Sequence, residues 1–380
     1  MRLVFATKDL SLAGRTFEGF PLLIGLDGWP VEPVQTFLWY VLVESGEALS
    51  PLTWEAYGRR LFDYFAFLEA NDLAWDEQSV APGLSVLARY RDWSSGELGL
   101  DSSTVNKRLA LIVRFYRWAK LRGLVSLLPF SEKRVRVAKN LGLLSHTTCS
   151  APESTKPSVM VRERRRLTKF LTKIQAKVCL ALNTDPSHKI LFHLMLRTGL
   201  RSCEARSFPV KYVFNPRLKK GLRQGQMISV ALEPKDMYIK FGRPRTIDVP
   251  WSLMEAMWSY SLHQREIRKS YGDGNVSALL LTKEGRQYSK DSVVDVMKAY
   301  EKKCGFYVRA HMLRHTYGTY TLFALRKSKS FGGDPLLYVR DRMGHSDVQT
   351  TMIYLHVMNQ LEAQSVLAHE DEIDMMFLAE

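Results

Sequence analysis

Four side chains late in the chain have the types needed to attack a phosphodiester and to hold its charge. His311 and Arg314 stand three residues apart, His345 follows a glycine further on, and Tyr354 comes nine residues after His345. A spacing of three places His311 and Arg314 on one face of a helix, where both can reach one phosphate. The phenol is a candidate nucleophile, since cations and imidazoles can stabilise its anion. His315 is adjacent to Arg314, and we expect it to point elsewhere.

Two further cations lie upstream, each two residues from a glycine. Arg201 follows Gly199 at the start of an expected helix, and Glu204 comes three residues later. Lys240 ends an expected strand, shortly before Arg245. Lys235, which lies five residues before Lys240, is the alternative candidate for the functional lysine of this segment.

This set of separate motifs, in this order, resembles the tyrosine recombinase (phage integrase) family. The resemblance implies that two planar guanidinium groups, Arg201 and Arg314, hold the non-bridging oxygens of the cleaved phosphate. Glu204 would support this clamp, and Lys240 would enter the minor groove and protonate the leaving 5′ oxygen. The implied catalytic set is Arg201, Lys240, His311, Arg314, His345 and Tyr354.

The same resemblance implies the reaction. Tyr354 attacks the phosphate and leaves a 3′-phosphotyrosine and a 5′-hydroxyl, and the hydroxyl of a partner strand reverses the attack. His311 would accept or share the tyrosine proton, and His345 would bind a non-bridging oxygen. The bond energy stays in the phosphotyrosine, so no metal, ATP or other cofactor is expected. The hypothesis is a site-specific recombinase, the integrase of a mobile element. Two alternatives are a type IB topoisomerase-like enzyme and a non-catalytic DNA-binding regulator with this fold.

The charge of the chain suits an anionic partner. It has 54 Lys and Arg against 39 Asp and Glu, a net charge of +15. Many of the cations form a belt that begins at Lys107, and such a belt suits a phosphate backbone. The DNA-binding candidates are Lys107, Arg108, Arg117, Lys120, Lys133, Arg134, Arg136, Lys139, Arg243 and Arg245.

The pattern of apolar residues predicts a mostly α protein with a small antiparallel β-sheet. We expect an N-terminal extension at 1–33 with short strands, a helical core-binding DNA clamp domain at 34–130, and a basic linker at 131–161. A mixed α/β catalytic domain would follow at 162–368, with three strands at 227–232, 237–240 and 245–249.

The remaining sequence features concern partners and compartment. The tail 369–380 ends in acidic and apolar residues, which predicts docking on a neighbouring protomer and a tetramer on two DNA sites with inverted half-sites. The segment 325–335 is interpreted as an inserted loop. Four cysteines without metal-binding spacing, and no apolar run long enough for a membrane span, favour a cytoplasmic, nucleoid-associated protein.

Overall fold

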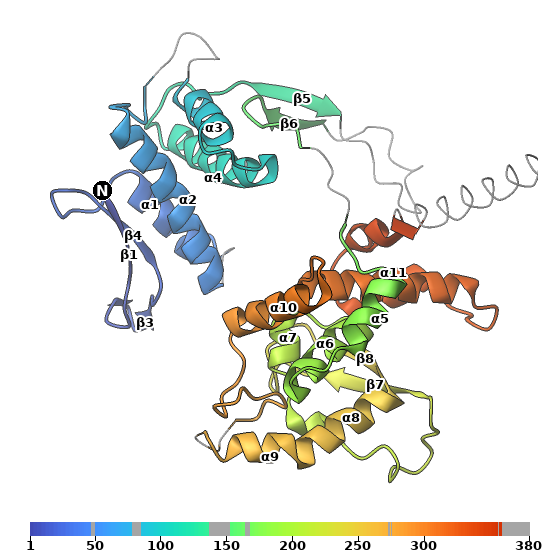
Figure 1. The fold of residues 1–380 in the computed structure, drawn as a ribbon. Coiled ribbons are helices and arrows are strands. Elements are labelled where there is room, and N and C mark those ends of the chain that lie inside the picture. Colours follow the sequence, from blue (N-terminus) through green and yellow to red (C-terminus); the bar gives the residue numbers. More distant parts are fainter. Residues whose placement is uncertain are drawn as a thin grey trace, which may run out of the picture. The chain divides into compact units, whose positions relative to one another are not determined.

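The chain folds into two compact units, Met1–Arg165 and Arg166–Glu380. The structure, a computed structural model (Figure 1), describes residues 1–46, 50–77, 85–136, 153–163, 168–272, 274, 276–355 and 357–358. Helices dominate the described parts of both units, and the strands described there pair in two-stranded antiparallel sheets. The predicted fold class is confirmed.

The first unit begins with paired strands. β1 (Arg2–Phe5) and β4 (Pro21–Ile24) fall in the segment where short strands were expected, and they run antiparallel with Leu3 opposite Leu23. β2 (Ser11–Leu12) pairs with β3 (Arg15–Thr16). Leu23 is fully buried in the same core as the helices that follow. The segment 1–33 is therefore an integral layer of the first unit.

Helices form most of the rest of this core. Apolar residues at helical spacing face inward from α2 and α4, and Tyr64 and Tyr116 share a buried hydrogen bond of 2.6 Å between their hydroxyls. The elements are α1 (Val34–Trp39), the π-helical turn η1 (Tyr40–Glu44), α2 (Pro51–Ala70), α3 (Val86–Gly96) and α4 (Ser102–Leu121).

The predicted linker is ordered where the structure describes it. β5 (Glu132–Arg136) pairs with β6 (Glu153–Pro157), and Val159 is buried in the core of the first unit. Asn106 of α4 fixes the chain beyond β6, since its Oδ1 accepts from the backbone N–H of Val161 at 2.9 Å. These residues belong to the first unit because their backbone groups find partners there, which a solvated linker would not require.

The described part of the second unit is a helical body around a two-stranded sheet. β7 (Met227–Leu232) and β8 (Arg245–Pro250) are antiparallel and contribute Val230, Ile247 and other side chains to the core. The helices are α5 (Lys173–Ala181), α6 (Pro186–Thr198), α7 (Ser202–Arg206), α8 (Trp251–Leu262), α9 (Gln264–Lys269), α10 (Lys290–Cys304), α11 (Ala310–Lys327) and α12 (Pro335–Met343), with 3-10 turns η4 (Val210–Tyr212) and η5 (Lys240–Gly242). Residues 348–355 are also helical.

The prediction of a third strand at 237–240 is wrong. Met237 and Ile239 are buried while Tyr238 is exposed, so the alternation that suggested a strand is real. The backbone N–H of Tyr238, however, donates to the Ser207 hydroxyl at 3.2 Å. The segment is extended because its side chains enter the core, and Lys240 opens a 3-10 turn.

Two further expectations concern the C-terminal part. α11 continues to Lys327 and α12 begins at Pro335, so part of the predicted 325–335 loop is helical. The tail 369–380 lies outside the described residues.

Candidate active site

Arg201 is positioned by a tight helix end. α6 stops at Gly199, whose φ of 68° is left-handed, and a Cβ there would lie 2.5 Å from the ring of Tyr317. Glycine is therefore required both by the backbone and by the close approach. The chain then turns so that Arg201 opens α7, and its Nη2 donates to the carbonyl oxygen of Gly344 at 3.0 Å.

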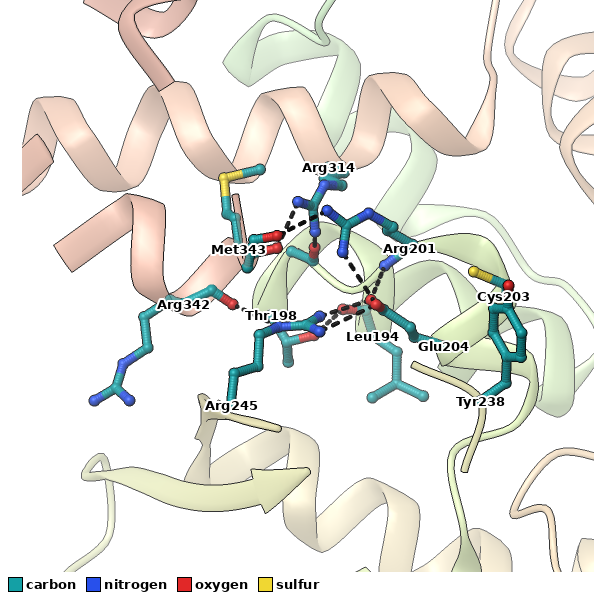
Figure 2. Close-up of polar contacts among 12 residues, drawn as sticks. Leu194, Thr198, Arg201, Cys203, Glu204, Tyr238, Arg245, Arg314, Arg342 and Met343 are labelled. Atoms are coloured by element: carbon teal, nitrogen blue, oxygen red, sulfur yellow. Dashed lines mark hydrogen bonds and ion pairs between the residues drawn. The ribbon is translucent and has the colours of Figure 1, made fainter. Parts of the chain in front are cut away.

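Glu204 is a buried carboxylate at the base of the site. Arg245 of β8 donates to both of its oxygens, at 3.0 and 2.6 Å, and Arg201 Nη1 donates to Oε1 at 3.1 Å (Figure 2). Burial alone would raise the pKa of Glu204, but the hydrogen bonds and charge of Arg245, followed by those of Arg201, lower it to about 2. Glu204 is thus ionised and fixes both guanidinium groups.

Arg314 lies on α11 and its side chain is only 2% exposed. Its Nη1 donates to the carbonyl oxygen of Gly199, and its Nη2 donates to that of Met343 at 2.6 Å. Arg201 binds the next carbonyl along the chain, Gly344, so the two guanidinium groups lie side by side (Figure 2). Burial, and then the charge of Arg201, lower the pKa of Arg314 to about 9.

Tyr354 lies in the helix 348–355 with its side chain almost fully buried, at 1% exposure. Its ring packs so closely on α11 that a Cβ at Gly318 would lie 2.7 Å from two ring carbons. Burial raises the pKa of Tyr354 to about 12, while the positive charges of Arg314 and Arg201 act in the opposite direction. The phenol is protonated at neutral pH, so its attack needs a base and a stabilised anion.

The expectation that His315 points elsewhere was wrong. His315 Nδ1 lies 3.1 Å from the Tyr354 hydroxyl, within hydrogen-bond distance. Burial, and then the nearby His311 and Arg314, lower the pKa of His315 to about 3, so its ring is neutral at pH 7 and has one nitrogen that accepts hydrogen bonds. The sequence held the signal for this, because His311 and His315 are four residues apart on one helix face.

His311 is exposed and contacts the other histidine. Its ring is perpendicular to that of His315, with 4.3 Å between the centroids. Of the two histidines, His315 is the one within hydrogen-bond distance of the Tyr354 hydroxyl.

His345 follows the left-handed Gly344 that ends α12, where φ is 64°. Its Nδ1 lies 2.9 Å from the Thr351 hydroxyl, and its ring is nearly parallel to that of Tyr354 with 6.2 Å between centroids. Burial, and then the charges of Arg314 and Arg201, lower the pKa of His345 to about 3. Thr351, which the sequence analysis missed, orients this ring.

Lys240 is exposed at the edge of the site. It lines a pocket of about 390 Å³ together with Arg243 and His345, and its Nζ lies 4.9 Å from the centroid of the Phe241 ring. The pocket thus joins the turn that carries Lys240 to the loop that carries His345.

The structure gives several of the proposed DNA-binding residues other partners. The Arg245 side chain is 7% exposed and binds Glu204, Arg108 binds Asp63, and Arg117 binds Glu132. These three guanidinium groups form ion pairs within the protein. For Arg245, the buried ion pair with Glu204 is a structural role that the sequence did not indicate. The exposed candidates are Lys107, Lys120, Lys133, Arg134 and Arg243. The side chain of Arg136 and all of Lys139 lie outside the described residues.

Neither a metal site nor a membrane span is found in the part of the chain that the structure describes. No group of three or more His, Cys, Asp or Glu side chains is arranged to hold a metal ion. No helix there is long and apolar enough to cross a membrane.

A buried tyrosine beside two histidines and within the influence of two arginine charges, in a mainly helical unit, is typical of the tyrosine recombinase class. Residues 169–360 match the model of the phage integrase family, and residues 34–123 match the phage integrase N-terminal SAM-like domain. The chain belongs to the phage integrase family and is a site-specific recombinase.

Individual relatives are similar in sequence to this chain over most of its length. It is 26% identical over 367 residues to transposase A from transposon Tn554 of Staphylococcus aureus, covering 90% of this chain and 92% of that protein. It is 26% identical over 345 residues to tyrosine recombinase XerC of Alcanivorax borkumensis, covering 88% and 92%. Its fold is similar, with a TM-score of 0.56 and 15% identity, to XerH site-specific recombinase bound to palindromic difH substrate, covering 88% of this chain and 85% of that one.

Proposed function

We propose that this recombinase breaks and rejoins DNA through Tyr354, as the enzyme of a mobile element. The observation that carries the proposal is the 3.1 Å contact between the Tyr354 hydroxyl and His315 Nδ1, next to two paired guanidinium groups. A neutral imidazole takes the phenolic proton, and the phenolate oxygen attacks phosphorus. The bond to the 5′ oxygen breaks as the 3′-phosphotyrosine forms.

The two arginines stabilise the charge that develops on the phosphate. Arg201 and Arg314 each use two of their nitrogen atoms in the protein contacts described above, which leaves further N–H groups for phosphate oxygens. Glu204 and the carbonyl groups hold both forks in place before DNA arrives. Such preorganised donors lower the barrier without a reorganisation cost in the reaction itself.

Lys240 is the proposed general acid, and His345 the proposed ligand of a non-bridging oxygen. Both line the pocket of about 390 Å³, so a phosphate there could be reached by each. Lys240 gives its proton to the leaving 5′ oxygen, and the 5′-hydroxyl of a partner strand later reverses the attack. The scheme uses protein groups alone, so we expect cleavage to persist in excess EDTA.

The similarity to a transposase and to XerC favours a recombinase over the two alternatives, a type IB topoisomerase-like enzyme or a non-catalytic regulator. We propose that the partner is double-stranded DNA with inverted half-sites, bound by a tetramer on two sites in the cytoplasm. XerH, whose fold is similar, was solved on a palindromic substrate. Exposed cations such as Lys107 and Arg243 would contact the phosphates.

The decisive test is covalent capture on a nicked duplex that contains the end of the element. Tyr354→Phe removes only the phenolic oxygen and should abolish the adduct while leaving the Kd for DNA nearly unchanged. Tyr271→Phe, a change at an exposed tyrosine, is the matched control and should react normally. A wild-type yield of adduct from Tyr354→Phe would refute the assignment.

The tail proposal needs a separate experiment. Removal of residues 369–380 should leave cleavage of single sites intact and impair complete recombination, because the nucleophile precedes the tail. If the truncated protein recombines at the wild-type rate, the tail does not link protomers. Failure to cleave at all would show instead that the tail packs on its own unit.

A further inference from the structure

We propose that Phe241 is an apolar wedge that packs against the base and sugar next to the cleaved phosphate and positions Lys240 there. The inference rests on the proposed function, since it assigns a DNA contact at the same site. It names a residue beside the catalytic set that would decide how the DNA is distorted at the cleavage point.

The backbone of Phe241 is unfavourable for its side chain. Its φ of 69° and ψ of 8° are left-handed, and the next residue, Gly242, has a φ of 62°. Glycine adopts this conformation readily, and asparagine tolerates it, but a bulky side chain with a Cβ rarely does. A strained residue of this kind persists where the surrounding structure or a function requires it.

The ring of Phe241 is 70% exposed, so its burial within the described unit does not offset the strain. Nearby Met237 and Ile239 are buried and hold the segment in the core. The turn is thus anchored by its apolar residues while it presents the phenyl ring outward. An exposed aromatic ring on such a rigid base is suited to contact a partner.

The charges around Phe241 indicate which partner this is. Lys240 Nζ lies 4.9 Å from the ring centroid, and Arg243 lines the same pocket as the ring. A partner with both anionic groups and flat apolar surfaces fits this combination, and DNA has phosphates beside stacked bases. Aromatic rings stack on bases, and apolar wedges partly unstack base steps.

The contact with Lys240 connects the wedge to the reaction. The pocket that the ring lines also contains His345. When the ring packs against the nucleotide beside the cleaved phosphate, the ammonium group that rests on the ring is carried to the same phosphate. Phe241 is therefore a positioning residue for Lys240.

The test uses a duplex with 2-aminopurine next to the cleavage point, which is first mapped by covalent capture with the wild-type protein. Binding of the wild type should raise the 2-aminopurine fluorescence, because the base is unstacked. Phe241→Gly should lose this signal and bind about tenfold more weakly, the range of one lost aromatic–base contact. Phe241→Leu, which keeps an apolar side chain, should retain part of the signal.

Three readouts separate a wedge from a structural role. The Tm of Phe241→Gly should be unchanged or higher, because glycine relaxes the backbone. The dependence of Kd on salt should keep its slope, because no cation is removed. Tyr271→Ala removes another aromatic ring, 71% exposed and outside this pocket, and should behave as wild type.

The outcomes distinguish the two proposals. If the wild type forms no Tyr354 adduct, the proposed function falls. If the adduct forms but the wild type leaves the fluorescence unchanged, or Phe241→Gly matches the wild type in fluorescence and affinity, the wedge alone is overturned. Should the glycine variant fail to fold, Phe241→Asn takes its place, because asparagine removes the ring and tolerates the same backbone, and the same loss of fluorescence and affinity is expected.

Discussion

His315 Nδ1 lies 3.1 Å from the hydroxyl of Tyr354, whereas the ring of His311 rests against the ring of His315. This relationship assigns the two histidines of α11 different tasks. We propose that His315 takes the proton of the nucleophile and that His311, which is exposed, faces the phosphate.

We first predict that His315→Gln slows covalent capture by about 10² to 10⁴, the range typical of a lost general base. Glutamine can hydrogen-bond to the phenol but cannot accept its proton. The rate of adduct formation in single-turnover conditions measures the effect, with exposed His263→Gln as the control. A larger loss from His311→Gln than from His315→Gln would show that the proton goes to His311.

The acid role of Lys240 predicts a selective rescue. Lys240→Ala should cleave an ordinary duplex slowly, because the 5′ oxygen leaves without a proton. A substrate with sulfur in place of that oxygen should be cleaved at nearly the wild-type rate, since a thiol has a pKa of about 8.5 and leaves as the anion. His315→Gln should gain little from the same substrate. Equal slowness of Lys240→Ala on both substrates would exclude the acid role.

Substitution of either clamp residue by lysine should reduce cleavage by about 10² to 10³, because an ammonium group cannot reproduce the planar fork. Arg314→Lys should also lower the free energy of unfolding more than Arg201→Lys, since Arg314 is buried and holds the carbonyl groups of Gly199 and Met343. Cleavage rates and urea midpoints measure the two effects. Arg217→Lys, at an exposed ion pair, is the control.

Gly318→Ala should displace the nucleophile without touching any charged group. The added Cβ would lie 2.7 Å from the Tyr354 ring and 3.0 Å from Met343 Sδ. We expect a loss of about 1 to 3 kcal/mol in the free energy of unfolding, as for other overpacked cores, together with a lower rate of adduct formation. Gly96→Ala, where a Cβ meets nothing within 4 Å, should change neither quantity.

The buried histidines predict a loss of stability in mild acid. The pKa of His315 is lowered from 6.5 to about 3 in the folded protein, so the unfolded chain binds the proton more tightly. The stability that the neutral ring confers is complete above pH 6.5 and declines as the pH falls toward 3. Between pH 7.5 and 5.0 the wild type should lose up to about 2 kcal/mol more than His315→Gln in urea unfolding. An identical loss in both proteins would contradict the assigned pKa.

The sequence alone indicated the candidate residues of the catalytic set and several of the helices, but not the places of His315 and Thr351 in the site. Local spacing is enough for this, because His311, Arg314 and the apolar stripes of α2 and α4 follow the period of one helix. Short apolar runs separated by turns also indicated strands within 1–33, whereas the pairing of Leu3 with Leu23 is known only from the structure.

Only the tertiary structure decided which groups meet. Arg245 is separated from Glu204 by 41 residues and Arg201 from Gly344 by 143, and helix periodicity says nothing about such pairs. A cation expected to bind DNA binds a buried carboxylate instead, because an ionised carboxylate inside a protein must find a charged partner. The 237–240 segment alternates between buried and exposed residues as a strand does. Alternation does not encode hydrogen-bond partners, and the backbone N–H of Tyr238 donates to the Ser207 hydroxyl and not to another strand.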